Sequence, residues 1–520
     1  MKHKIVLLAI AALAAFETQA AKPRLIVNIV VGSMRAEDLD RYADNFGEGG
    51  FRRLTDGGTR YTDSRYDCLQ TTTPVSLATL ATGAMPSTHG VIGHRWIDYT
   101  SNTPVVLTEG RYGPGPEQLI APTLCETLLR QAPGSRVVTV AADAESAVVT
   151  SGRDGECYWL DEHCAWATSL AYAPLLPEWI SRHNRERYNL SYVETEWRTL
   201  FDRSRYRNTR HWDIALTGRS KRDKEEPADG RIRPASDLDR MRYTPAGNTA
   251  VLGFAKQAIA QSGLGADATP DLLNICLDAS RRIVEAYGPE SIEAEDMYYR
   301  LDRDLADFLT FLFAQVRNGE VLVVLTSDHG TSASYDCGEQ PAERFNARQF
   351  EVIVNSFLNV RYGTGQWVVA YEDKCLWLNH NLIYERGLDL ADVQNEVAIF
   401  AMQFGGVSHA LAATAMRTSY FGSGYARKMQ NSFYPRRSGD VILNFMPGWI
   451  EERERCVSSS GSMYGYDTRV PLIFYGTGVG PQRIGRRVEM TAVAPTLARA
   501  AGIAEPAASE GEILKEIVDL

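Results

Sequence analysis

The sequence predicts an α/β protein with a mostly parallel central sheet flanked by helices. The first observation is that Leu25–Val31, Arg136–Ala142 and Val321–Ser327 are apolar runs enriched in β-branched residues, which is typical of strands buried on both faces. The second is that helical patterns separate these runs. Strands that alternate with helices favour a parallel sheet, with functional sites at the strand ends.

The clearest helical pattern covers residues 300–313. Apolar side chains recur there at intervals of three and four, so they share one face of a helix. Those residues are Leu301, Leu305, Phe308, Leu309 and Leu312. We therefore expect an amphipathic helix before the third apolar run.

Length and charge limit the possibilities further. The 520-residue chain is 44% hydrophobic and 23% charged, an ordinary globular composition. A chain of this length exceeds one core, so we expect one large α/β domain with insertions, or two lobes. The net charge of -10 argues against binding to nucleic acid or to an anionic membrane as the main role.

Residues 1–20 have the pattern of a secretory signal peptide. Lys2 and Lys4 precede an apolar segment, and Ala20 ends a plausible cleavage site. The apolar run is too short to span a membrane, and no later stretch is long and apolar enough. We therefore expect residues 21–520 to form an exported mature protein, periplasmic or otherwise outside the cytoplasm.

The cysteines fit an oxidising compartment. The chain has eight of them and no CxxC motif, which argues against a thiolate zinc site. Cys157 and Cys164 could join the two sides of a hairpin, but spacing does not determine the pairing.

Two stretches interrupt the alternation of strands and helices, at about 180–240 and about 340–450. We expect both to be insertions that cap the edge of the sheet. In the first, Trp197, Tyr206 and Trp212 could form a surface that binds carbohydrate or lipid. The other interpretation is that these aromatic residues pack the cap onto the sheet.

The third apolar run ends on adjacent side chains that ligate metals. Asp328 and His329 follow it directly, and Gly330 allows a turn. Carboxylate and imidazole groups at the carboxyl edge of a sheet are typical of a metal site in an α/β enzyme. Two ligands do not hold a catalytic metal, so further ligands are needed elsewhere.

A series of motifs extends along nearly the whole mature chain. It includes LIVNIVVGSMRAEDLDRY, LATGAMPSTHGVIGHRWID, AYGPESIEAEDMYYRLDRDLADFL, LTSDHG and GSMYGYDTRVPLIFYG. In order and spacing these motifs resemble the alkaline phosphatase superfamily. They are most similar to the PafA-like bacterial alkaline phosphatases with a threonine nucleophile, which are related to nucleotide pyrophosphatases and phosphodiesterases.

The resemblance implies two zinc ions that clamp a phosphoryl group during in-line transfer. Thr73 stands at the position of the nucleophile, and Asp328 and His329 keep two ligand positions. The other ligand positions of the family are replaced, by Gly32, Arg281, Glu285 and Ser460. A guanidinium cannot ligate zinc, and Arg281 and Glu285 are spaced to pair on one helical turn. We therefore interpret Thr73, Asp328 and His329 as vestigial, their polar groups hydrogen-bonded to neighbours.

The family's phosphate clamp is also replaced. Its lysine and arginine fall on Asp143 and Glu145, and its asparagine falls on His94. Two carboxylates near each other in a partly desolvated cleft would repel phosphate, and could accept a cationic group such as a Lys- or Arg-bearing peptide. For His94 we expect a hydrogen-bonded core or rim histidine.

Three functional hypotheses follow. The first is an exported pseudoenzyme without bound cofactors, which binds or scaffolds a protein partner in the cell envelope. The second is a surviving hydrolase of phosphodiesters, phosphomonoesters or sulfate esters, with one residual metal at Thr73, Asp328 and His329. The third is a carbohydrate- or lipid-binding protein that uses the cap regions.

Overall fold

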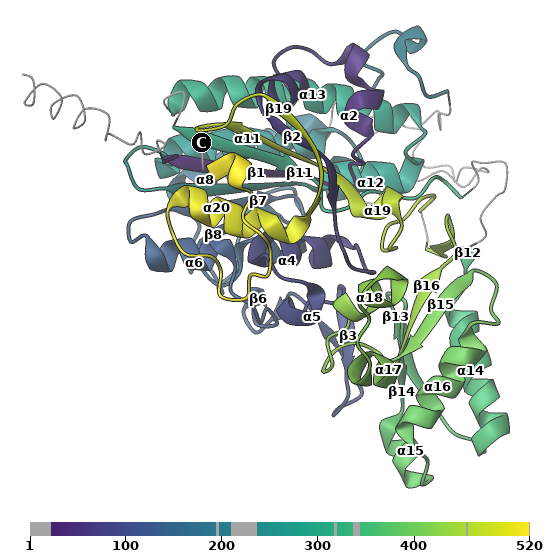
Figure 1. Cartoon of the computed structure of the whole chain (residues 1–520). Helices are drawn as coiled ribbons and strands as arrows, with labels where there is room; N and C mark the ends of the chain where they lie inside the picture. Colours follow the sequence, from purple (N-terminus) through teal and green to yellow (C-terminus); the bar gives the residue numbers. More distant parts are fainter. Residues whose placement is uncertain are drawn as a thin grey trace, which may run out of the picture.

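The computed structural model describes residues 22–193, 197–209, 237–316, 320–335, 344–453 and 456–518. The signal peptide expected at residues 1–20 and the side chain of Trp212 lie outside the described residues. Figure 1 shows a large α/β body and a smaller lobe that projects from it. Within the described ranges, no helix is both long and apolar enough to cross a bilayer.

A nine-stranded sheet forms the centre of the described body, in the order β19-β2-β18-β11-β1-β10-β7-β8-β9. β1 (Leu25–Val31) lies between β10 (Asp271–Leu277) and β11 (Val321–Thr326), parallel to both. β7 (Val137–Ala141) and β8 (Glu156–Leu160) continue the parallel part. The predicted α/β fold with a mostly parallel sheet is confirmed.

The rest of the sheet is mixed. β18 (Arg469–Gly476) is antiparallel to both β11 and β2 (Thr59–Arg65), and β19 (Gln482–Glu489) is parallel to β2. β9 (Trp166–Ala167) adds a short antiparallel strand at the far edge.

Alternate residues of β1 face two separate cores. Leu25, Val27 and Ile29 belong to the core on one face, and Ile26 and Val30 to the core on the other. Helices cover both faces, which explains why the strand is apolar throughout. The first face is covered by α3 (Phe51–Gly57), α11 (Ala246–Ser262), α12 (Asp278–Tyr287) and α13 (Ile292–Gln315), and the second by α4 (Thr73–Thr82), α6 (Leu124–Gln131), α7 (Ala144–Ser151) and α20 (Val493–Ala501). The helix expected over residues 300–313 is the C-terminal part of α13.

The projecting lobe has a core of its own. Its antiparallel sheet has the order β13-β14-β16-β15, with strands Val368–Glu372, Cys375–Leu378, Val441–Phe445 and Val407–Ala412. Its helices are α14 (Ala347–Tyr362), α15 (His380–Glu385), α16 (Leu390–Ala401), α17 (Ala413–Thr418) and α18 (Gly424–Asn431). The stretch expected as an insertion at about 340–450 thus contains an independent sheet rather than only a surface cap.

Shorter elements complete the described chain. They are α2 (Asp38–Arg41), α5 (Pro86–His89), β3 (Arg95–Asp98), β4 (Thr103–Val106), β5 (Glu109–Gly110), β6 (Gly113–Pro114), α8 (Glu178–Arg185), α9 (Tyr188–Val193), α10 (Asp237–Arg242), β12 (Arg344–Phe345), β17 (Ile450–Glu451), α19 (Gly465–Thr468) and α21 (Lys515–Val518), with 3-10 turns at Ala43–Asn45, Arg203–Arg205 and Met490–Ala492.

Trp197 and Tyr206, from the stretch at about 180–240, pack against the body. The indole of Trp197 donates to Asp296 Oδ2 at 2.6 Å, and the Tyr206 hydroxyl donates to Asp296 Oδ1 at 2.5 Å. Tyr206 is buried in the core on the α13 side. These two side chains therefore hold the stretch onto α13, which favours the packing interpretation for Trp197 and Tyr206.

The possible Cys157–Cys164 bridge is not formed. Cys157 is a buried free thiol on β8, and burial raises its pKa. The hairpin between β8 and β9 is closed instead by backbone hydrogen bonds, from Asp161 N to Ala165 O at 2.9 Å and from Cys164 N to Asp161 O at 3.0 Å.

We predict that Gly330→Ala lowers the free energy of unfolding by about 1–3 kcal/mol, because a methyl group there must displace backbone. A Cβ at Gly330 would lie 1.9 Å from the carbonyl oxygen of Tyr466. Urea denaturation measures the change. Gly480→Ala is the matched control, since a Cβ there meets no atom within 4 Å, and equal stability of the two variants would contradict the prediction.

Candidate functional site

The candidate site begins where β1 and β11 end side by side. The two strands pair in parallel, with Val30 opposite Thr326, so Ser33 lies next to Asp328. Ser33 adopts a left-handed φ of 56° and its backbone N–H donates to Asp328 Oδ1 at 2.9 Å. The sheet register therefore fixes this carboxylate in place.

Thr73 joins Asp328 and His329 from the start of α4. Its hydroxyl donates to Asp328 Oδ2 at 2.8 Å and lies 3.2 Å from His329 Nε2. His329 Nδ1 lies 2.7 Å from the Gly330 carbonyl, which assigns the ring proton to Nδ1 and leaves Nε2 as an acceptor. Ser460 Oγ lies 3.4 Å from the same Nε2. The structure thus brings together the three predicted vestigial residues, already hydrogen-bonded to one another as expected.

Arg281, on α12, occupies the position beside Gly32. A Cβ built on Gly32 would lie only 2.8 Å from Arg281 Cβ, so the backbone at Gly32 leaves no room for a side chain. The guanidinium contacts Glu285 Oε2 at 3.4 Å, which confirms the predicted pair on one helical turn. It also contacts Asp143 Oδ2 at 3.1 Å. Although burial opposes its charge, the neighbouring carboxylates raise the pKa of Arg281.

Asp143 is surrounded by arginines. Arg242 Nε lies 2.8 Å from Oδ1, and Arg281 and Arg282 lie 3.1 and 3.2 Å from Oδ2. Burial opposes ionisation, but the three guanidinium groups hold the pKa of Asp143 below its ordinary value. The sequence analysis did not predict Arg242 and Arg282 as partners, because both lie far from Asp143 in the sequence.

Glu145 has a partner of its own in His94. Glu145 Oε1 lies 2.7 Å from His94 Nδ1, and the His94 side chain is 42% exposed, which makes it the expected rim histidine. Asp143 and Glu145 were expected to act as like charges that attract a cationic guest. That expectation is corrected, because both carboxylates are already paired within the protein.

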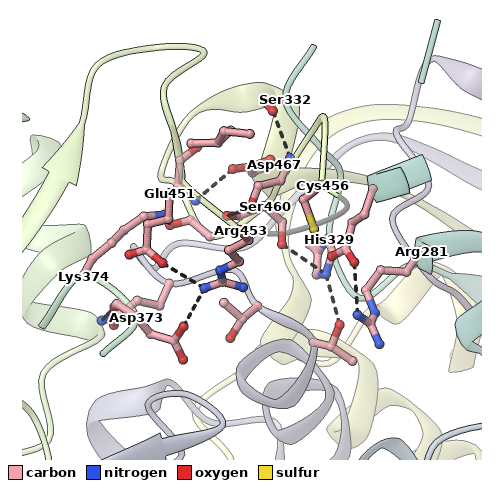
Figure 2. Close-up of a pocket in the computed structure, with 18 of the residues that line it drawn as sticks. Arg281, His329, Ser332, Asp373, Lys374, Glu451, Arg453, Cys456, Ser460 and Asp467 are labelled. Carbon is pink, nitrogen blue, oxygen red and sulfur yellow. Dashed lines mark hydrogen bonds and ion pairs between the residues drawn. The ribbon is translucent and has the colours of Figure 1, made fainter. Parts of the chain in front are cut away.

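The projecting lobe supplies the opposite wall of the cleft, which sequence reasoning missed. Arg453 Nη2 lies 3.0 Å from Asp373 Oδ1 and 2.9 Å from Glu451 Oε2 (Figure 2). Lys374 follows in the tight turn between β13 and β14, and burial lowers its pKa. The sequence feature that could have predicted this wall is the charged pair Asp373 and Lys374 between two apolar strands. Together the two walls enclose a cavity of about 250 Å³.

The residues of the cleft do not fit two zinc ions. At one metal position the resemblance leaves Arg281, Glu285 and Ser460, and of these only Glu285 is a common zinc ligand. Within the described residues, no cluster holds three or more histidine, cysteine, aspartate or glutamate side chains suited to a metal. At the other position, Thr73 Oγ1, Asp328 Oδ2 and His329 Nε2 converge, so at most one incomplete set of metal donors is present.

Comparison with known proteins agrees with this architecture. The family model for type I phosphodiesterase / nucleotide pyrophosphatase matches residues 26–466. Alkaline phosphatase PafA of Elizabethkingia meningoseptica is 28% identical over 520 residues, covering 96% of this chain and 95% of PafA. Alkaline phosphatase PhoV of Synechococcus elongatus is 26% identical over 530 residues, covering 97% of this chain and 94% of PhoV.

The crystal structure of wild-type PafA matches with a TM-score of 0.87 at 26% identity, covering 96% of this chain and 99% of PafA. Because the match covers almost the full length of both chains, it includes the lobe as well as the body. The chain therefore belongs to the type I phosphodiesterase / nucleotide pyrophosphatase family, as a PafA-like member of the alkaline phosphatase superfamily.

Proposed function

We propose that this chain is an exported pseudoenzyme with the alkaline phosphatase fold, which binds a partner or ligand and does not hydrolyse phosphate esters. The observation that carries the proposal is Arg281. Its Cβ lies against Gly32 at a ligand position of the family's zinc site, and its guanidinium pairs with Asp143 and Glu285. Members of the family use metal ions. In this chain we propose that the guanidinium of Arg281 balances the negative charge of the nearby carboxylates in place of a metal ion.

The electrostatics of the cleft support the proposal. A divalent ion beside Arg281 would meet a positive charge, since Arg281 keeps its proton at any ordinary pH. A phosphate group would meet cations that are already paired, because Arg281 contacts two carboxylates and Arg453 contacts two more. Neither zinc nor phosphate therefore gains the interactions that two-metal catalysis requires.

The proposed location is the cell envelope. It rests on the signal-peptide pattern of residues 1–20. The fold matches almost the full length of PafA, and together with the replaced metal-ligand positions this supports a use for the shape itself. We propose an envelope protein or an envelope ligand as the partner.

A second candidate is a single-metal hydrolase of phosphodiesters, phosphomonoesters or sulfate esters. The observation in its favour is that Thr73, Asp328 and His329 still converge within 3.3 Å of one another. In this case a bound metal would lower the pKa of the Thr73 hydroxyl. Asp328 and His329 would hold the metal, and their present hydrogen bonds to Thr73 would be replaced.

Metal analysis separates the two candidates. We predict that the purified mature protein, stripped with EDTA and dialysed against zinc, retains far less than one zinc per chain. It should hydrolyse p-nitrophenyl phosphate no faster than buffer does. Mass spectrometry of metals and the absorbance of p-nitrophenolate measure the two quantities. Near-stoichiometric zinc that is lost in Asp328→Asn or His329→Ala, together with turnover that is lost in Thr73→Val, would establish the second candidate.

We also predict that Arg281→Ala lowers the free energy of unfolding by about 2 kcal/mol or more. Removing one partner from a buried ion pair costs about 3–5 kcal/mol, and the loss is smaller here because Arg242 and Arg282 still neutralise Asp143. Urea denaturation checks the change. Arg361→Ala is the control, since Arg361 pairs with Glu396 in an exposed ion pair worth about 0–1 kcal/mol.

The same variant tests the electrostatic argument. Without the guanidinium charge, zinc should bind more tightly to the cleft of Arg281→Ala than to that of the wild type, as isothermal titration would show. Unchanged stability and unchanged zinc affinity together would mean that Arg281 does not compensate charge in the cleft.

A further inference from the structure

The cleft contains buried hydrogen-bond acceptors that the protein does not use. Three side-chain oxygens have no hydrogen-bond partner in the described part of the chain: Gln70 Oε1, Thr72 Oγ1 and Asp467 Oδ1. All three residues line the cavity of about 250 Å³, and Gln70 and Asp467 are each only 1% exposed. Buried polar atoms are normally satisfied, so these atoms point to a ligand that donates hydrogen bonds.

Gly461 brings these residues together. A Cβ built on Gly461 would lie 3.1 Å from Lys374 Nζ and 3.3 Å from Thr72 Cγ2. Lys374 Nζ donates to the Gly461 carbonyl, and the next residue, Ser462, donates its backbone N–H to Asp467 Oδ2 at 2.8 Å. We call Gln70, Thr72, Lys374, Gly461 and Asp467 the acceptor subsite.

Gln70 is held at the edge of the same group. Its Nε2 donates to the Asp373 carbonyl at 3.2 Å and lies 3.1 Å from Cys375 Sγ, so Gln70 is anchored on both sides of Lys374. That anchorage uses the amide nitrogen and leaves the amide oxygen as the free acceptor. Residues from the segment before α4, from the lobe, and from α19 and the loop before it thus meet at one point.

The charges around the acceptor subsite exclude two classes of ligand. An anion such as phosphate would approach the Asp467 carboxylate and two further acceptor oxygens, while Arg281 and Arg453 are already paired. A cationic ligand would approach Lys374. Burial raises the pKa of the nearby Asp467 carboxyl to about 6, and the Lys374 ammonium opposes that rise. An uncharged hydrogen-bond donor is repelled neither by the Asp467 carboxylate nor by the Lys374 ammonium.

The rest of the wall suits a ligand with an apolar ring face. Trp449 and Tyr466 line the same cavity. Aromatic side chains with a few convergent polar atoms are typical of small-molecule sites. The cavity is slightly smaller than the range of about 300–1,000 Å³ for drug-sized ligands, which fits a ligand of one ring.

We infer that the cleft binds a small, uncharged, hydroxyl-rich ligand of the saccharide or cyclitol class, whose O–H groups donate to Gln70, Thr72 and Asp467. The inference rests on the proposed function, because it gives the binding role a ligand. It differs from the carbohydrate surface first considered at Trp197 and Tyr206, which pack against α13.

The test uses the EDTA-treated mature chain and saturation-transfer NMR. The hydroxyl-rich probes are methyl β-glucoside, N-acetylglucosamine and myo-inositol, and the comparison probes are inorganic phosphate and lysine amide. We expect at least one hydroxyl-rich probe to bind, and more tightly than either comparison probe. Thr72→Val and Gln70→Met should each weaken that binding about five-fold, the effect of one lost hydrogen bond.

Thr168→Val is the matched control. Thr168 Oγ1 is an equally unpartnered hydroxyl that does not line the cavity, so its loss should leave binding unchanged. Binding that is equally weakened in all three variants, or that is unchanged in Thr72→Val and Gln70→Met, would overturn the inference. So would a lack of binding by every hydroxyl-rich probe, or tighter binding of phosphate or lysine amide.

Zinc content and p-nitrophenyl phosphate turnover of the same preparation keep the two proposals separate. An inactive, metal-free protein that binds none of the hydroxyl-rich probes would contradict the inference and leave the pseudoenzyme proposal standing. Stoichiometric zinc with turnover would contradict the pseudoenzyme proposal, and with it the binding role on which the inference rests.

Discussion

The parallel pairing of β1 with β10 and β11 is the constraint on which the cleft depends. β1 is in register with both neighbours, so Gly32, the start of α12 and Asp328 emerge at one edge of the sheet. Because these strands are buried on both faces, a one-residue shift in register would move each core residue of β1 into the packing of the opposite face. The positions of Arg281 and Asp328 are therefore set by the packing of the whole body, and not by local preferences at the cleft.

Within that frame, the guanidinium of Arg281 determines the charge balance. Taking a guanidinium out of water costs several kcal/mol unless carboxylates surround it, and Arg281 contacts both Glu285 and Asp143. Asp143 in turn is shared among three arginines. The same pattern recurs on the lobe, where Arg453 lies between Asp373 and Glu451. Charges in the cleft are thus paired with one another, although the Nε atoms of Arg281 and Arg282 have no hydrogen-bond partner within the described residues.

The sequence predicted the parts of this arrangement that depend on local pattern. The central strands were found because they are apolar on both faces, and the Arg281–Glu285 pair because four residues make about one helical turn. The motif resemblance placed Thr73 with Asp328 and His329. The sequence could not show that Arg242 neutralises Asp143, because the two residues meet only through tertiary packing. The lobe's sheet was also missed, since its short strands carry mixed burial and weak periodicity.

Under the proposed function, the acceptor subsite would give a cleft without catalysis a binding role. Polar groups that line a buried cavity need hydrogen-bond partners. Each buried group left without one costs about 1–3 kcal/mol of stability. On the side near Gly32, Arg281 pairs with its carboxylate partners, although its Nε has no hydrogen-bond partner in the described chain. On the side near Gly461, the oxygens of Gln70, Thr72 and Asp467 have not been compensated within the described chain. The acceptor subsite joins Lys374 of the lobe to Thr72 and Gly461 of the body, so a ligand bound there would lie between the two. Under the proposed function, binding at the acceptor subsite would then stabilise the arrangement of lobe and body, a role that requires no hydrolysis.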